Sequence, residues 1–437
     1  MPSEINVRSQ ARYAPSSGYA EPSARRSGRE MWVGAAAACA AALLASATAA
    51  IAQAPLTEAE AARLAVAGPE WDAAAAARRR AIEARAAATG LRPNPELEVA
   101  HEGGEGFGGD GAEDSARLTY PLDLTGARRA QRQAGRVRAE MELAEAEQRL
   151  VERSAEARRL FHKVTSLSRR EAVLGRRIEL LQTATDITLR RFKEGDASEL
   201  ELRRVELEAG AARAERDRVV SQRAAAWASL SALIGVAAAP PSASPPSATP
   251  LPPLDDLLRL MEQSATMRRA RAETALAEAE VQAIRRESRF ADTAVFGGLR
   301  SVEDPMGRTT GVLVGGRVGL PVLGGGRARL QAELAEATAA RADERLLLEQ
   351  RRRSVVAAHA SAVRLNEGVR QAAEAVALHD RVFRPARAAW EGGEIELTEL
   401  LNIYRTATDA ELAALELSEE AAEARVEMDA LVGKIEP

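Results

Sequence analysis

The sequence predicts a mainly α-helical protein with membrane β-strands, built as a tandem helix–strand–strand–helix repeat. Three observations predict this fold class. Aromatic residues make up only 3% of the 437 residues, whereas Ala, Glu, Arg and Leu dominate, a composition typical of long helices and coiled coils. The region 128–194 contains no proline and would extend about 100 Å as a single helix, at roughly 1.5 Å per residue. The third observation is a heptad pattern that occurs once in each half.

The heptad pattern is a row of apolar residues on a helix, which we call the seam. In the second half the seam consists of Leu400, Ile403, Ala407, Ala410, Ala414, Leu417, Ala421, Ala424, Met428 and Leu431. The first half repeats it, with two arginines, at Leu202, Val205, Ala209, Ala212, Arg216, Val219, Arg223, Ala226, Leu230 and Leu233. The repetition indicates an internal duplication, and the spacing predicts that each seam helix packs along another helix.

Charge and cysteine content exclude several classes of function. The net charge is -4, and basic residues alternate with acidic ones along the predicted helices, so we expect no nucleic-acid partner. The single cysteine, Cys39, excludes a disulfide framework and a thiolate metal site. The sequence GEGFGG at 104–109 matches a dinucleotide-binding pattern, but no apolar helix follows it. We therefore predict no enzyme, no cofactor and no metal site.

Residues 1–52 are predicted to be a signal peptide with a polar leader. Arginines between positions 25 and 29 precede an apolar run, 31–47, and Ala-Ile-Ala at 50–52 is a cleavage pattern before Gln53. Cleavage there would place a cysteine-free mature chain outside the cytoplasm. Lipidation of Cys39 is the less favoured alternative, because the apolar run continues beyond it.

The first repeat, 53–239, is expected to begin with a helix at 57–91, N-capped by Thr57. Two alternating segments, 96–101 and 117–122, predict strands, and a glycine-rich acidic loop at 102–114 joins them. The long helix then spans 128–194. Gly195 turns the chain, and the first seam helix runs back to Gly235.

Seven prolines at 240–253 predict an extended linker between the repeats. The second repeat, 254–437, has the same order: a helix at 254–286, strands at 293–299 and 311–320, a long helix from 327 to about 390, and the second seam helix between Gly393 and Gly433. Pro385 lies in the last turns of the long helix and is expected to bend it.

The strand 311–320 has an aliphatic face and a face of small or charged residues, as in a lipid-facing barrel strand. The residues assigned to barrel strands are Leu97, Val99, Leu118, Tyr120, Val312, Val314, Val318 and Leu320. Four strands cannot close a barrel, and an open sheet edge cannot face lipid, so the chain must associate. Two copies would supply eight strands and three copies twelve.

This order of elements resembles that of the TolC-type outer-membrane efflux proteins, the outer-membrane factors of tripartite efflux systems. The similar segments are LTYPLDLTGAR at 118–128, VGLPVLGGGR at 318–327, the glycine turns at 191–195 and 389–393, and the helix ends at 233–235 and 431–433. The first segment is most similar to the branch that serves heavy-metal and cation pumps. Aromatic girdle residues are scarce, with only Tyr120 and Phe296 near the strands, which departs from the expected barrel pattern.

The resemblance implies a homotrimer with a 12-stranded β-barrel in the outer membrane and a long α-helical barrel in the periplasm. It implies a passive exit duct for heavy-metal cations or drugs, working with a periplasmic adaptor (membrane fusion) protein and an RND-type inner-membrane pump. The adaptor-contacting tip would consist of Gly195, Asp196, Ser198, Gly393 and Glu394. Asp380 is a gate candidate and Pro385 a hinge candidate, with a solvated aspartate and a simple kink as the alternatives.

The sequence leaves two alternatives to an exit duct. A periplasmic adaptor has one helical hairpin followed by β-rich modules, whereas this chain has two predicted hairpins and ends on a helix. A soluble coiled-coil scaffold of an export machine would leave the strand 311–320 without an alternating sheet.

Overall fold

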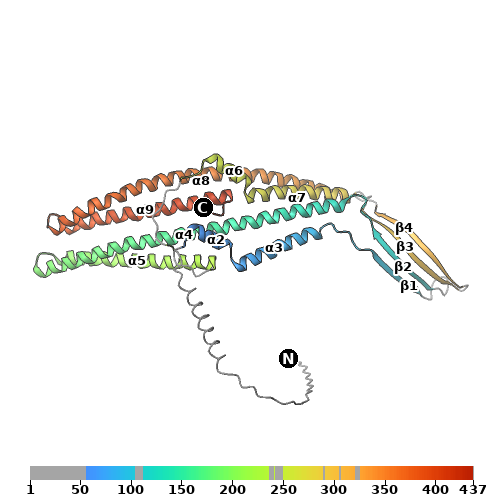
Figure 1. Cartoon of the computed structure of the whole chain (residues 1–437), viewed down its shortest axis with the longest axis horizontal. Helices are drawn as coiled ribbons and strands as arrows, with labels where there is room; N and C mark the ends of the chain where they lie inside the picture. The colour runs from blue at the N-terminus through green and yellow to red at the C-terminus, as the bar shows by residue number, and fades with distance from the viewer. Residues whose placement is uncertain are drawn as a thin grey trace, which may run out of the picture. The chain divides into compact units, whose positions relative to one another are not determined.

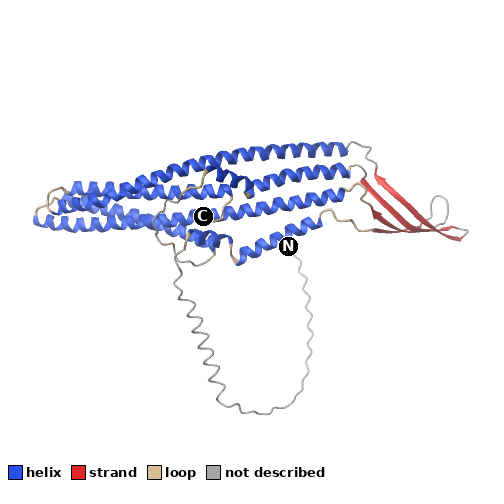
Figure 2. Ribbon diagram, turned by 45° about the horizontal axis from the view of Figure 1, so that its top comes forward, coloured by secondary structure: helices blue, strands red, loops and turns tan. Residues whose placement is uncertain are grey.

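The computed structural model describes residues 56–103, 112–235, 241, 250–288, 291–304, 307–319 and 325–436. The predicted signal peptide, most of the acidic loop 102–114, most of the proline-rich linker and Leu320 lie outside the described residues. All described residues belong to one unit of the chain, Pro55–Pro437. Its helices run side by side, and its strands are grouped beyond one end of them (Figures 1 and 2).

Two long helices, α4 (Ala127–Glu194) and α8 (Gly325–Glu391), form the length of this unit. They contain 68 and 67 residues without interruption, which corresponds to about 100 Å each at roughly 1.5 Å per residue. The predicted long helices are thereby confirmed. Pro385 lies inside α8, and the helix continues past it to Glu391.

Each long helix is followed by an antiparallel partner that forms a hairpin with it. Helix α5 (Glu199–Ile234) packs on α4, and α9 (Leu397–Val432) packs on α8. Ser198 starts α5 with a capping box, because its hydroxyl accepts from the Glu201 N–H at 3.2 Å while Glu201 accepts from the Ser198 N–H at 2.7 Å. Glycines with positive φ end both partner helices, at Gly235 and Gly433.

The predicted seam is correct for the first hairpin and only partly correct for the second. Seven apolar seam residues of α5 are buried: Leu202, Val205, Ala209, Ala212, Val219, Ala226 and Leu230. In α9 only Leu400 and Met428 of the predicted seam are buried, and Ala410 is exposed. Helix α9 packs against α4 as well as α8, so its buried residues spread beyond one heptad stripe and include Tyr404 and Thr408.

Two helices predicted as continuous are each divided in two. The helix expected at 57–91 consists of α2 (Glu58–Val66) and α3 (Pro69–Ala88), because Gly68 is extended and precedes a proline, which disfavours helical backbone. The helix expected at 254–286 consists of α6 (Leu254–Gln263) and α7 (Ala265–Glu287). Between them Ser264 is extended and N-caps α7 by accepting from the Met267 N–H.

The helices form a layer that is four helices wide on both sides of the break at Ser264. Toward the sheet the packing order is α3, α4, α7, α8, and toward the hairpin turns it is α5, α4, α9, α8. The end of α9 meets the start of α7, since a Cβ placed on Gly433 would lie 3.3 Å from the Ser264 Cβ. The apolar cores are therefore several clusters distributed along the helices, as in coiled coils, instead of one central core.

The four strands are β1 (Glu96–Gly103), β2 (Ala112–Pro121), β3 (Ala291–Asp304) and β4 (Gly307–Gly319). They form one antiparallel sheet in the order β1-β2-β3-β4, and the β2–β3 pairing joins the two repeats. The four predicted strands are confirmed, and each extends beyond the predicted end nearest the strand-connecting turns. Gly298 is required at the β2–β3 junction, because a Cβ there would lie 2.4 Å from the Ala116 carbonyl oxygen.

Candidate functional site

One face of the sheet is apolar and exposed, and we call it the apolar face. Paired residues of antiparallel strands share a face, and the register places Leu97, Leu118 and Val314 in one row and Val99, Leu299 and Val312 in the next. The exposed fractions of the large apolar residues on this face run from 40% for Tyr120 to 80% for Val314. An exposed apolar patch of this kind marks a surface that contacts lipid or another protein.

The apolar face ends in a polar row near the strand-connecting turns. His101 Nδ1 lies 2.7 Å from Asp114 Oδ1, and Arg308 pairs with the other oxygen of the same carboxylate. Between this row and the helices, Val312 to Val318 covers about 20 Å at roughly 3.4 Å per residue, comparable with the ~25 Å apolar band of outer-membrane barrels.

The opposite face of the sheet is charged, and we call it the polar face. Arg117 pairs with Glu98 at 3.6 Å and Arg300 hydrogen-bonds Glu113 at 2.6 Å, each pair joining residues of two different strands. The Arg117 guanidinium carbon lies 5.1 Å from the centre of the Phe296 ring on the same face. A sheet that alternates between an apolar and a charged face is the pattern of a barrel wall between lipid and water.

The sheet has two open edges, because β1 and β4 each pair with one neighbour only among the described strands. The helical layer is open in the same way. Leu200 and Leu207 on α5 are 78% and 74% exposed, and Leu378 and Val382 on α8 are more than half exposed. Two different edges that each need a partner fit a head-to-tail ring of identical copies.

The predicted tip residues lie in the two hairpin turns. Gly195 and Gly393 have φ of 87° and 78°, and both turns are Schellman motifs in which Asp196 and Glu394 donate backbone hydrogen bonds to the helix end behind them. The two turns belong to neighbouring hairpins, since Arg204 Nη1 donates to Thr398 Oγ1 at 3.3 Å. Figure 1 shows both turns at the end of the helices farthest from the sheet.

The hinge candidate Pro385 lies inside α8 next to the apolar cluster at the tip. Ala386 and Trp390 are buried in that cluster with Leu400 and Leu401 of α9. The side chain of Asp380 lies outside the described residues.

Polar contacts between the two hairpins were missed by the sequence analysis. Glu419 of α9 accepts hydrogen bonds from Ser166 at 2.6 Å and from Arg170 at 3.3 Å, both on α4, and Arg176 pairs with Glu411. Heptad spacing indicates that a helix has a partner, but it does not identify a second partner helix, so no sequence signal points to these pairs.

A buried arginine cluster was also missed. Arg158 of α4 is 1% exposed, and it donates to Glu58 of α2 at 2.7 Å and to Asp429 of α9 at 2.8 Å. Burial raises the pKa of the Glu58 carboxyl, but hydrogen bonds and charges from His162 and Arg158 outweigh it and lower the pKa from 4.5 to about 2. The cluster ties the start of the first repeat to the end of the second.

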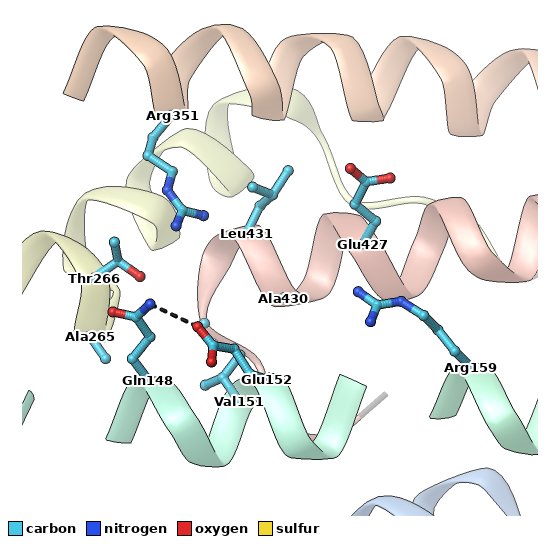
Figure 3. A pocket seen from close by; sticks show the side chains of 11 residues that line it. Gln148, Val151, Glu152, Arg159, Ala265, Thr266, Arg351, Glu427, Ala430 and Leu431 are labelled. Carbon is cyan, nitrogen blue, oxygen red and sulfur yellow. Dashed lines mark hydrogen bonds between the residues drawn. The ribbon is translucent and has the colours of Figure 1, made fainter. Parts of the chain in front are cut away.

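A cavity of about 150 Å³ lies where the end of α9 meets the start of α7, between α4 and α8 (Figure 3). Gln148, Glu152, Arg159, Arg351 and Glu427 line it, and Gln148 donates to Glu152 at 2.8 Å. The cavity is lined by both acidic and basic side chains, and these residues do not form an arrangement typical of catalysis.

None of the helices in the described ranges is long and apolar enough to cross a membrane. Nowhere in the described part of the chain do three or more His, Cys, Asp or Glu side chains gather as metal ligands.

No protein-family model and no curated protein matches this sequence. Solved structures do match it over most of the chain. CusC, whose crystal structures address folding and transmembrane channel formation, has a TM-score of 0.73 at 14% identity, covering 87% of this chain and 93% of its own. The Campylobacter jejuni CmeC outer membrane channel has a TM-score of 0.70 at 12% identity, covering 87% of this chain and 88% of its own. The outer membrane protein VceC of Vibrio cholerae has a TM-score of 0.69 at 14% identity, covering 86% and 96%.

At these identities the similarity shows the fold. The chain has the fold of these outer-membrane channel proteins, which confirms the predicted fold class and agrees with the resemblance drawn from the sequence.

Proposed function

We propose that this protein is the outer-membrane channel of a tripartite efflux system, a passive exit duct from the periplasm to the exterior. The observation that carries the proposal is the sheet, which has an exposed apolar face, a charged face and two open edges at one end of helices about 100 Å long. The fold shared with solved outer-membrane channels supports it. A periplasmic adaptor or a coiled-coil scaffold leaves the apolar face without a role.

Three copies would close the structure. Each copy contributes four strands, so three supply a 12-stranded barrel in which every open strand edge is paired. The same ring covers the exposed leucines of α5 and the exposed apolar residues of α8, and it places the helices around a periplasmic tunnel. We propose that the mature chain starts after residue 52 and consists of the repeats 53–239 and 254–437 with the linker 240–253 between them.

The partners follow from the two ends of the molecule. The apolar face contacts outer-membrane lipid, and the hairpin turns at Gly195, Asp196, Ser198, Gly393 and Glu394 contact a periplasmic adaptor protein. Energy comes from an RND-type inner-membrane pump, so the duct itself performs no chemical reaction. Asp380, as a gate, and Pro385, as a hinge, are proposed to narrow the tunnel near the tip to a width that still passes small ions, and heavy-metal cations or drugs are the proposed substrates.

Fractionation and bilayer recording test this proposal together. The mature protein should be recovered from the outer-membrane fraction, and the detergent-extracted protein should form conducting pores in a planar lipid bilayer. Recovery in the soluble fraction, or extracted protein that produces no conductance, would contradict the proposal.

The tip is tested separately in cells that lack their own exit duct. A bulky residue at Gly393 should reduce export while conductance of the purified channel stays unchanged, because the turn is exposed and its positive φ favours glycine. The same substitution at Gly175 on α4, where a Cβ meets nothing within 4 Å, is the matched control, because α4 packs between α5 and α9 and not at an open edge of the layer.

A further inference from the structure

The polar face carries one ion pair that differs from the others because an aromatic ring accompanies it. Arg117 of β2 and Glu98 of β1 are direct cross-strand partners, with Nη1 and Oε2 3.6 Å apart. Both side chains remain open to solvent, at 42% and 64% exposure. The attraction between two charges at this distance and exposure is weak, so each charge still acts on ions in the surrounding water.

The ring of Phe296 fixes where the arginine lies. A Cβ on Gly315 would lie 2.5 Å from the Phe296 Cζ, so the ring covers the glycine and lies along the wall of the sheet. The Arg117 guanidinium carbon is 5.1 Å from the ring centre, within the range of a cation–π contact. The Arg117 Nε has no hydrogen-bond partner among the described residues, which leaves the ring as its main neighbour on that side.

In the proposed trimer the polar face lines the lumen, because the apolar face contacts lipid. Twelve strands at about 4.8 Å spacing and ~40° tilt enclose a cylinder of roughly 24 Å between opposite backbones. Side chains narrow the lumen further, and charges act over about 10 Å at 0.1 M salt. Three Arg117–Glu98 pairs at one level therefore influence most of the cross-section.

We infer that the Arg117–Glu98 pair, with Phe296 as a positioning residue, sets the balance between cation and anion passage through the barrel. The inference rests on the proposed function. Arg117 favours anions and Glu98 favours cations, so removing one charge leaves the other acting alone. The two side chains therefore shift ion preference in opposite directions.

The test is the cation-to-anion permeability ratio of the full-length channel in a planar bilayer, measured in a salt gradient near 0.1 M. Arg117→Gln should raise this ratio roughly fivefold and Glu98→Gln should lower it roughly fivefold, because three screened charges about 10 Å from the passing ion shift cations and anions by about twofold each, in opposite directions. The matched control is Arg308→Gln, which removes an arginine from its pair with Asp114 on the apolar face. It should leave the ratio unchanged.

A double substitution tests the role of Phe296. In a Phe296→Leu background the shift caused by Arg117→Gln should shrink, because an arginine without the ring is no longer held at one place. An equal shift in both backgrounds would show that Phe296 does not position Arg117.

The outcomes separate the two proposals. An unsubstituted channel that does not conduct contradicts the proposed function and the inference with it. A channel that conducts but shows no opposite shifts, or shifts as much with Arg308→Gln, contradicts the inference alone. If one of the two variants fails to assemble, the other still decides, because its ratio must move in the direction stated for it.

Discussion

The first helical hairpin and the sheet use similar apolar residues in opposite ways. In the hairpin, Val205 and Leu230 are fully buried against α4 within one copy of the chain. In the sheet, Val312 and Val314 of β4 are 78% and 80% exposed, although β4 pairs along its length with β3. The seam of the hairpin is therefore buried within one copy, and only scattered residues such as Leu200 and Leu207 stay exposed. The apolar face of the sheet is exposed along its whole length, and in the proposed trimer lipid covers it.

The largest expected effect lies in the helical region, at the buried arginine cluster. Arg158→Ala leaves the buried Asp429 without its guanidinium partner and should destabilise the helices by about 3–5 kcal/mol. The loss is measured by helical circular dichroism during denaturation of the detergent-extracted protein.

The control for this variant is Arg203→Ala on α5. Arg203 is 65% exposed and pairs with Glu199 and Glu206 on the surface, so its replacement should leave the denaturation midpoint close to that of the parent. Equal effects of the two variants would mean that the buried cluster is not what joins the repeats.

A charge on the apolar face should affect the sheet and spare the helices. Val314→Arg should cost about 2–4 kcal/mol of membrane stability, because the arginine would face lipid. The fraction of chain assembled in the outer membrane measures it. Leu313→Arg, one residue away on the polar face, should assemble normally. If Leu313→Arg blocks assembly and Val314→Arg does not, the two faces are assigned the wrong way round.

Two adjacent glycines of β3, Gly297 and Gly298, should differ in their tolerance of a side chain. Gly298→Ala forces a Cβ to within 2.4 Å of the Ala116 carbonyl oxygen and should destabilise the β2–β3 pairing by about 1–3 kcal/mol. Gly297→Ala meets nothing within 4 Å and should be close to neutral. Heat-induced loss of the folded band on a gel reports barrel stability, and similar losses for both variants would contradict the close approach of the strands.

The smallest predicted effect concerns pH. The Glu58 pKa is lower in the folded protein, about 2, than in the unfolded chain, so its contribution is complete above about pH 4.5 and is lost as pH falls toward 2. After allowing for its partial exposure we expect about 1–2 kcal/mol. The stability difference between the parent and Glu58→Gln should shrink between pH 4.5 and 2. A difference that is constant over this range would show that the carboxylate charge contributes nothing.

The order of elements could be predicted from the sequence because periodicity and glycines mark it directly. The 68-residue helix and the turn at Gly195 follow from local pattern alone. The break at Gly68 had a readable signal in the Gly-Pro pair, whereas the break at Ser264 depends on a cap that resembles any surface serine.

The arginine cluster could not be predicted, since Glu58 and Asp429 lie 100 and 271 residues from Arg158. The buried residues of the second seam were predicted only in part, because α9 has a second partner helix, α4, that no local pattern reveals. Tertiary contacts of this kind need coordinates.

The central claim is that neighbouring copies complete the sheet, and the mass of the intact assembly tests it most directly. Native mass spectrometry of the protein extracted from the outer membrane should show a single species of three chains. A monomer that keeps its strands, or an assembly with another number of chains, would contradict the account.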